Sequence, residues 1–458
     1  MSFDRIERVI HSIRRLLAQG RREEVVQLIE ALMPADQAEV FGELPLGEQE
    51  QLLGEVEVQD AADILEELDE EDAAALAETL DAASLTQILD EMEPDEAADL
   101  LGDLDPPRQR LALAQMTTAE DVRPLLRYPD DSAGGLMTSD FNAFPEGARI
   151  GQVFRSIREQ PARGEEIPYV YAVDDESRLV GIAQLADLIR AHPAQPLSAI
   201  ARTDVVSIDA WEDQEVAARI LERYDFTALP VLDAQSRLVG VITADDAMAT
   251  LEEEATEDIY KSAGILAGGE GQAAKSDLLV RGPVWRVWAV RIPFLMIMLV
   301  GGLLAGAIVG AYEASLEAVV ALAFFIPVVM NLGGSAGVQS TAIFIRGHAL
   351  GQIDTREFYS HLLREMLVGL GMGAILGVLA GLVAFLWQGV AEIGLAVGLS
   401  LACTMTVAAS LGFLIPFLLV KLGLDPAAGS SPFITTLKDI SGLLIYFAFA
   451  TLFLGHLF

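Results

Sequence analysis

The stretch "FFIPVVMNLGGSAGVQST", residues 324–341, places a proline, three glycines and two amide side chains inside an apolar segment. The apolar residues predict a membrane-spanning helix, whereas Pro327 and the glycines disfavour regular helical backbone. Irregular backbone at membrane depth occurs only where it is buried in protein or lines a water-filled cavity. We therefore expect a broken helix that lines an ion path, and a simple kink is the alternative.

Five apolar segments fill the C-terminal part of the chain, at residues 288–312, 316–345, 362–388, 392–421 and 432–457. Most exceed the ~20 residues that span a bilayer. Basic residues before the first and third segments and after the second and fourth place the N-terminal part in the cytoplasm and the C-terminus outside. The N-terminal residues also lack the apolar core of a signal peptide. These features predict a multi-pass transporter or channel of the cell (inner) membrane.

Gly369, Gly373, Gly377 and Gly381 recur at intervals of four in the third apolar segment. Small residues at this spacing lie on one face of a helix and allow a second helix to approach closely. This ladder therefore predicts helix packing and not an ion path.

The last apolar segment contains "TTLKDISGLLIY", residues 435–446, with Lys438 and Asp439 side by side. An ionisable group inside a spanning helix costs roughly 2.5–3.5 kcal/mol, so it is usually retained for a function. Adjacent helical positions point about 100° apart. We expect Asp439 to face an ion path while Lys438 extends to the cytoplasmic interface. The alternative is an ion pair between the two side chains.

The chain carries 68 acidic and 30 basic residues, a formal net charge of −38, and the whole excess lies in the first 280 residues. Between Glu23 and Asp105 there are 28 carboxylates and no lysine or arginine. Such a surface repels nucleic acid and anionic headgroups. Crowded carboxylates favour a hard cation such as Mg²⁺ or Ca²⁺. The alternative is a solvated acidic face that aids solubility.

Residues 59–104 repeat with a period of 12, and each unit opens with acidic or polar residues and closes with apolar ones. This pattern predicts one short helix per unit, stacked on the next in a small helical solenoid.

Two α/β units follow, "IPYVYAVD" with "LVGIAQLADLIRA" (167–174, 179–191) and "DFTALPVLD" with "LVGVITADDAMATL" (225–233, 238–251). Each predicts a strand, a turn, a strand and a helix. The pair resembles a CBS tandem, a regulatory module that often binds adenine nucleotides. Thr243 and Asp246 resemble its ribose-contacting motif, and the first unit is taken to have Ala183 and Ala186 in those places. ATP is therefore expected only in the second unit.

Together these patterns predict a multidomain protein, with an all-α superhelical N domain and an α/β CBS tandem before an α-helical membrane domain with five transmembrane helices. The expected boundaries are residues 1–130 for the acidic N domain, 131–196 and 197–250 for the CBS units, 251–280 for a connecting helix and linker, and 281–458 for the membrane domain.

Several motifs resemble, in order, the MgtE-type magnesium channels and transporters. They are "YPDDSAGGLMT" (128–138), "DFTALP", "TADD", "EEEATEDI", "LEAVVALAFFIPVVMNLGGSAGVQS" and "TTLKDISGLLIY", and the resemblance covers almost the whole chain. It implies a homodimer with its pore on the two-fold axis, and a "plug" helix that connects the CBS tandem to the pore.

The resemblance also implies site residues. Asp439 would bind the pore ion, completed by backbone carbonyls of the broken segment and of a turn at 430–435. The implied pore-lining residues are Pro327, Asn331, Gly334, Ser335, Gln339, Ser431, Thr435 and Lys438. Regulatory Mg²⁺ would bind at Asp213, Glu215, Asp225, Asp246, Glu254, Glu257 and Asp258, with Asp63 and Glu96 on the N domain. High cytosolic Mg²⁺ would then hold the acidic faces together and close the pore.

Other functions stay open at this point. Ser335 and Lys438 depart from the pattern of the family, which leaves another divalent cation (Co²⁺, Mn²⁺ or Zn²⁺), or coupled exchange, as an alternative. A nonconducting sensor of Mg²⁺ or nucleotide is a further one. An enzyme is not expected, because the sequence has no P-loop and its five histidines show no metal-ligand spacing.

Overall fold

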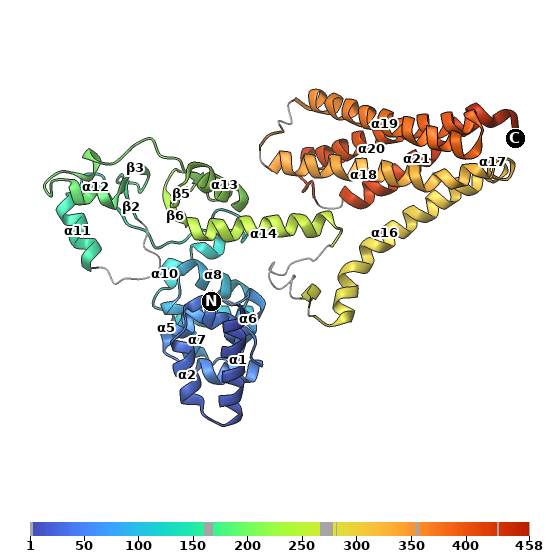
Figure 1. Ribbon diagram of the computed structural model, residues 1–458. Helices are drawn as coiled ribbons and strands as arrows, with labels where there is room; N and C mark the ends of the chain where they lie inside the picture. Colours follow the sequence, from blue (N-terminus) through green and yellow to red (C-terminus); the bar gives the residue numbers. More distant parts are fainter. Residues whose placement is uncertain are drawn as a thin grey trace. The chain divides into compact units, whose positions relative to one another are not determined.

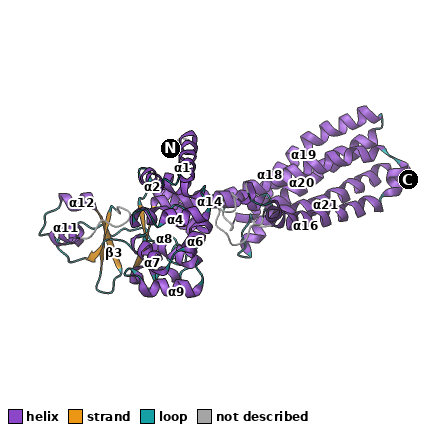
Figure 2. Ribbon diagram, turned by 90° about the horizontal axis from the view of Figure 1, so that it is seen from below, coloured by secondary structure: helices purple, strands orange, loops and turns teal. Residues whose placement is uncertain are grey.

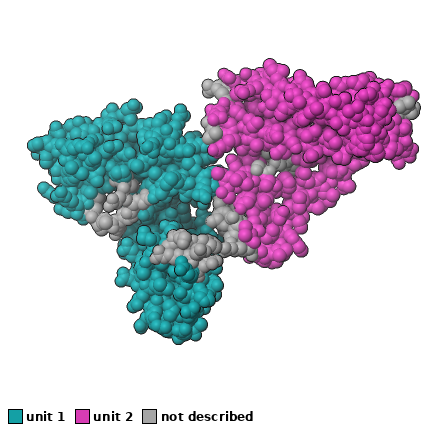
Figure 3. Space-filling view, in the orientation of Figure 1, with its two compact units in different colours: residues 1–254, 270–275 teal, residues 255–269, 276–458 magenta. Residues whose placement is uncertain are grey.

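The computed structural model describes residues 3–159, 168–265, 278–280, 282–349, 351–353, 357–427 and 430–457. They form two compact units, the first up to Glu254 and the second from Ala255 onward (Figures 1 and 3). Helices dominate both, and the few strands lie in the CBS region (Figure 2). Most of the expected glycine-rich linker, residues 264–275, lies outside the described residues.

The first unit opens with α1 (Phe3–Ala18) and a run of short helices. Eight of them begin at intervals of 12 residues: Arg22–Glu30 (α2), Pro34–Gly42 (α3), Leu46–Leu53 (α4), Val58–Glu66 (α5), Glu70–Thr79 (α6), Ala82–Glu91 (α7), Pro94–Asp103 (α8) and Pro106–Gln115 (α9). The expected solenoid is confirmed, and its period extends well beyond residues 59–104. Acidic residues in the first turns of α6 and α8 suit the positive end of the helix dipole.

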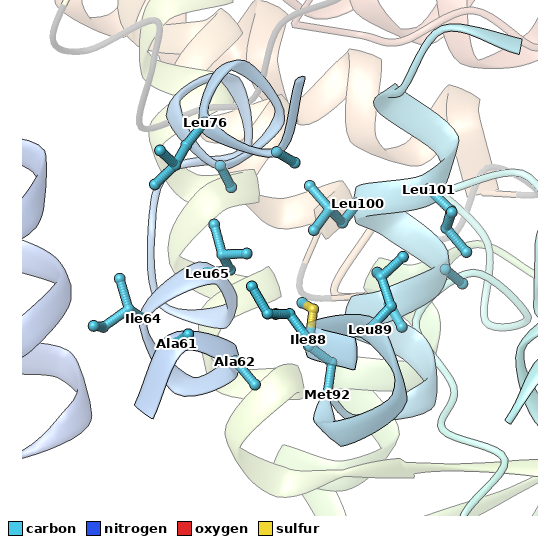
Figure 4. Close-up of a cluster of buried hydrophobic side chains, with 14 of the residues drawn as sticks. Ala61, Ala62, Ile64, Leu65, Leu76, Ile88, Leu89, Met92, Leu100 and Leu101 are labelled. Atoms are coloured by element: carbon cyan, nitrogen blue, oxygen red, sulfur yellow. The ribbon is translucent and has the colours of Figure 1, made fainter. Parts of the chain in front are cut away.

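The main contacts between these helices differ from simple stacking on the next one. They join α3 to α5, α5 to α7 and α7 to α9 on one side, and α4 to α6 and α6 to α8 on the other. Buried side chains such as Ile64, Leu76 and Leu89 fill the space between the two rows (Figure 4). One row alone could not cover its apolar face, so the helices alternate between two rows.

After α10 (Ala119–Val122), two three-stranded sheets form the CBS tandem. In the first, β2 (Tyr169–Val173) pairs parallel with β1 (Ala143–Pro145) and antiparallel with β3 (Leu179–Gln184). In the second, β5 (Ala228–Leu232) pairs in the same way with β4 (Ile208–Asp209) and β6 (Leu238–Thr243). The helices are α11 (Ile150–Glu159), α12 (Leu185–Arg190) and α13 (Gln214–Tyr224). The long helix α14 (Ala244–Ser262) follows β6 directly, as the sequence predicted.

The second unit contains five helices long and apolar enough to cross a membrane among the residues described. They are α16 (Val284–Ala311), α18 (Ala321–Ala349), α19 (Phe358–Gln388), α20 (Ala391–Lys421) and α21 (Ser430–Leu454), with the short α17 (Glu313–Ala318) between the first two. Helix α20 packs against α18, α19 and α21. Five membrane helices are therefore confirmed.

The glycine ladder of α19 lies against α20. A Cβ atom added at Gly381 would lie 2.6 Å from the carbonyl oxygen of Gly394, and one at Gly373 would lie 2.8 Å from the Cα atom of Ala402. The backbones of the two helices are thus in contact, as the spacing predicted.

The prediction of a broken second segment is wrong, because α18 runs unbroken from Ala321 to Ala349. Its glycines leave room for neighbouring side chains: a Cβ at Gly333 would lie 2.8 Å from Cγ2 of Thr404 on α20. Pro327 removes one backbone donor, which membrane helices tolerate when neighbours re-satisfy the freed group. The expected turn at 430–435 is also helical, since α21 begins at Ser430 and Pro432 falls in its first turn.

Candidate functional site

A cavity of about 370 Å³ lies between helices of the acidic N domain and the start of α14, within the first unit. Eight carboxylate residues contribute to its lining: Glu66, Glu67, Asp69, Glu70, Glu96, Asp99, Asp103 and Glu253. No lysine or arginine lines it. Such a cavity concentrates negative charge and so attracts cations.

Burial and mutual repulsion hold protons on several of these groups. Burial, followed by the charges of neighbouring carboxylates, raises the pKa of Glu96 to about 9 and that of Asp99 to about 8. The pKa of Glu66 rises to about 7 and that of Glu93 to about 8, again chiefly through burial. A carboxylate in this state releases its proton when a metal cation arrives.

Asp95 supplies a further buried oxygen beside this set. It is 7% exposed, burial raises its pKa to about 6, and its Oδ1 atom has no hydrogen-bond partner within the described part of the chain. A buried oxygen without a donor is costly, and a bound cation would satisfy it. The donor set therefore fits a hard divalent ion, which prefers carboxylate oxygens.

Two predicted regulatory ligands meet in this region. Asp246, at the start of α14, raises the pKa of Glu96 on α8 as well as those of Glu93 and Asp95. Its Oδ2 atom accepts a hydrogen bond from Oγ1 of Thr243 at 2.5 Å. Asp63 on α5 acts on Glu66 in the same way. The structure thus gathers carboxylates of the N domain around the first turn of α14.

The other predicted regulatory residues have local partners. Asp213 caps α13 by accepting from the backbone N–H of Glu215 at 2.8 Å, and the Glu215 carboxylate pairs with Arg219. Asp225 ends α13 in the left-handed conformation, with φ of 54°.

Along α14, Glu254 accepts from Nε2 of Gln214 at 3.2 Å, Glu257 pairs with Lys261 at 2.9 Å, and Asp258 follows Glu257 directly. Among the described residues, no three His, Cys, Asp or Glu side chains are close enough to hold a metal ion together. The predicted regulatory ligands therefore stay a prediction.

Four predicted pore-lining residues share one face of α18. Pro327, Asn331, Ser335 and Gln339 recur at intervals of four, so they lie above one another on the helix, and all four are exposed. The Ser335 hydroxyl donates to the carbonyl of Asn331 at 3.1 Å. Thr435 is half-buried on α21, and the side chain of Ser431 lies outside the described residues. A membrane-spanning helix thus presents a polar stripe that the described residues of the single chain leave uncovered.

The expectation that Lys438 extends to the cytoplasmic interface is wrong. Lys438 is buried, and its Nζ atom lies 3.1 Å from Oδ1 of Asp439. A Cβ at Gly334 would lie only 2.6 Å from the same ammonium group. The long side chain therefore turns inward against α18, where a glycine leaves room for it.

A second cavity, of about 120 Å³, lies between the two CBS units. Tyr169 and Gln184 of the first unit, Arg202 of the connection and Phe226 of the second unit are among its lining residues. Thr243 is absent from that lining and is only 4% exposed. The cavity has the aromatic faces and the cation that a nucleotide requires.

The strand register also corrects the motif assigned to the first unit. Leu179–Gln184 and Leu238–Thr243 are equivalent strands, so Gln184 and Asp187 match Thr243 and Asp246. Ala183 and Ala186, taken from the sequence, are each one position off. The first unit therefore retains the acidic residue, and the signal was present in the shared "LVG" that opens both strands.

Sequence reasoning did not single out Glu66, Glu93, Asp95 and Asp99 either. The 12-residue period was the available signal, because Glu66, Glu78 and Asp90 occupy equivalent positions and each accepts a backbone N–H 27 residues later in the chain.

Five membrane helices with a buried charged pair, joined to an acidic solenoid and a CBS tandem, define a regulated ion-transport protein of the membrane. The MgtE family, described as divalent cation transporters, matches residues 326–449. The MgtE intracellular N domain matches residues 32–131, and the CBS domain matches residues 197–253.

Two curated relatives cover most of the chain. The magnesium transporter MgtE of Thermus thermophilus is 41% identical over 350 residues, 76% of this chain and 75% of the relative. That of Bacillus subtilis is 36% identical over 347 residues, with the same coverage. The chain belongs to the MgtE family of magnesium transporters.

A solved structure resembles the first part of the chain. The cytosolic domain of the Mg²⁺ channel MgtE in complex with ATP has a TM-score of 0.50 and 34% sequence identity. It covers 53% of this chain and 99% of the solved one.

Proposed function

We propose that this chain conducts Mg²⁺ across the cell (inner) membrane through a homodimeric pore. The observation that carries the proposal is the exposed polar stripe of α18, Pro327–Asn331–Ser335–Gln339. Polar side chains on a spanning helix face protein or water and not lipid. A second copy of the chain, placed against this stripe, would enclose a polar path.

Asp439 is the proposed ion ligand of that path. Its side chain is 28% exposed, so it can be reached from an aqueous path. Two facing carboxylates, one from each copy, would suit an ion that keeps part of its water shell. The carbonyls that we first expected from broken backbone are engaged in helices, so any further ligands must be side chains or water.

Closure of the pore by cytosolic Mg²⁺ is the second part of the proposal. The carboxylates around Glu96 and Asp246 repel one another unless protons or cations neutralise them. Bound Mg²⁺ would hold the N domain against the start of α14, the proposed plug helix. At low Mg²⁺ the repulsion would separate them. The N-terminal domains are proposed to be cytoplasmic and the C-terminus extracytoplasmic.

Uptake measurements test this proposal. The full-length chain is reconstituted in lipid vesicles, and Mg²⁺ entry is followed with an entrapped indicator at low and at high Mg²⁺ on the cytoplasmic side. Entry at low Mg²⁺ and its suppression at high Mg²⁺ are expected. Absence of Mg²⁺ entry under both conditions would leave a nonconducting sensor as the better interpretation. Faster entry of Co²⁺, Mn²⁺ or Zn²⁺ than of Mg²⁺ would favour the other divalent ions.

ATP is a second proposed ligand, at the cavity between the CBS units, supported by the lining of Tyr169, Arg202 and Phe226. An adenine ring stacked on an aromatic side chain gains about 1–3 kcal/mol. Phe226→Ala should therefore weaken ATP binding by about tenfold in calorimetry of the full chain, while Thr243→Val should have a small effect. The opposite pattern would return the site to the second unit.

A further inference from the structure

Lys438 lies where the cation of the proposed pore would bind. Its side chain is 11% exposed, and its ammonium group lies 3.1 Å from Oδ1 of Asp439. The two residues are adjacent on α21, so their Cα–Cβ bonds point about 100° apart. Only the length of the lysine side chain brings its charge back to the neighbouring carboxylate.

Helix α18 is shaped for this ammonium group. Gly334 is buried, and a Cβ atom there would lie 2.6 Å from Nζ of Lys438, closer than a non-bonded carbon and nitrogen can approach. Gly334 is followed by Ser335, which belongs to the polar stripe. The positive charge therefore sits between the proposed ion ligand and the helix that carries the proposed pore lining.

A tethered ammonium and a free cation cannot both occupy the same carboxylate oxygen. A group held by a short link competes at an effective concentration on the order of millimolar. A monovalent ion at the same distance gains no more Coulomb energy than the ammonium that it replaces, whereas a divalent ion gains about twice as much. Displacement therefore favours divalent ions.

We propose that Lys438 is a tethered competitor of the transported cation at Asp439, which lowers the affinity of the pore and excludes monovalent ions. The inference rests on the proposed function, since it takes Asp439 as the ion ligand. A purely structural ion pair is the alternative. That pair would stabilise α21 without affecting the concentration dependence of transport.

The test compares Lys438→Gln with the wild-type chain in vesicles. The Mg²⁺ concentration that gives half-maximal uptake should fall at least about fivefold, the lower end of the usual range for coupled sites. Uptake of Na⁺ in the absence of divalent ions should appear in the variant and not in the wild type. Lys438→Arg retains the charge and should shift half-saturation less than Lys438→Gln. Lys421→Gln, at the C-terminal end of α20, is the matched control and should shift neither quantity.

Gly334→Ala provides a second route if Lys438→Gln fails to assemble. The added methyl group would force the ammonium away from its position without removing it, so half-saturation should again fall. Unchanged half-saturation in the variants that assemble, with no Na⁺ uptake, would overturn the proposal.

The two levels of the argument fail differently. A wild-type chain without Mg²⁺ uptake removes the proposed function. An active wild type, an inactive Asp439→Asn and a Lys438→Gln variant with normal half-saturation leave the proposed function standing and remove the competitor role of Lys438.

Discussion

The acidic helices around α8 and the charged pair on α21 both keep carboxylates away from bulk water, but with different counter-charges. Around α8, protons neutralise Glu93, Glu96 and Asp99, and no basic side chain lines their cavity. On α21, the ammonium of Lys438 neutralises Asp439. The first arrangement responds to the cation content of the solution, while the second sets a fixed threshold that an incoming ion must exceed. The difference shows how one chain can bind the same ion in two concentration ranges.

The largest effect is expected from removing the carboxylate of the pair. Asp439→Asn should reduce Mg²⁺ uptake to background, because the variant no longer attracts a divalent ion against the charge of Lys438. The double variant Lys438→Gln/Asp439→Asn should be equally inactive. Glu313→Gln, at the start of α17, is the control carboxylate of the same unit and should keep normal uptake. Retained uptake in Asp439→Asn would break the comparison at its membrane end.

The pH dependence of stability should distinguish protons from a fixed counter-charge. Buried carboxylates with raised pKa values bind protons in the folded state that the unfolded chain releases near pH 4. Their stabilising contribution is complete below that pH and is lost as pH rises through the folded values, about 6 for Asp95 to about 9 for Glu96.

The facing groups act in the same direction, since Asp245 and Asp246 of α14, Glu66 of α5, and Asp103 and Asp130 are all acidic. In detergent and EDTA, the melting temperature of the first unit of the full chain should therefore fall between about pH 6 and about pH 9. Excess Mg²⁺ should flatten this slope. A melting temperature that rises over the same range would contradict the assignment.

A single neutralisation around α8 should have a smaller effect. Glu96→Gln removes one member of the repelling set, so without Mg²⁺ the first unit should melt about 2–4 °C higher, the shift for about 1 kcal/mol in a unit of this size. The gain in melting temperature on adding Mg²⁺ should shrink. Glu71→Gln on α6, an exposed carboxylate of the same domain, serves as the control. Equal responses of the two variants would show that the acidic surface acts only in bulk.

The smallest effect is expected from a partly exposed pair of the second unit. Lys261 bridges Glu257 and Asp425 at 2.9 Å and 2.5 Å, and its side chain is 25% exposed. Exposed ion pairs contribute about 0.2–1 kcal/mol. Lys261→Gln should therefore lower the melting temperature of the second unit by less than about 2 °C. A larger loss would show that fixed counter-charges matter to stability in this unit beyond the Lys438 pair.

Local signals in the sequence predicted most of the fold. Hydropathy located the five membrane helices, strand alternation located both CBS units, and the 12-residue period located the helices of the N domain. Each of these signals depends on residues close together in the chain. The extension of the period to Arg22 was missed because the early units are less alike in sequence, although their spacing is the same.

The site was less predictable, because it depends on contacts between distant residues. Gly333 and Gly334 suggested broken backbone, and only the positions of Thr404 and Lys438 explain them as space left for side chains. The direction of Lys438 likewise depends on the cavity that α18 offers, which no spacing within α21 could reveal. The raised pKa values around Glu96 arise from helices that lie far apart in sequence.

The uniform step of the N domain has a consequence for how such chains change length. Eight successive helices begin 12 residues apart, and alternate helices meet through similar surfaces. Inserting or deleting two steps, 24 residues, would preserve the alternation of rows and bring the same kind of surface to each new junction. Any other change of length would put apolar side chains on the outside. The array therefore works as a ruler with discrete marks, and the acidic face of α8 can be carried nearer or farther only in those steps.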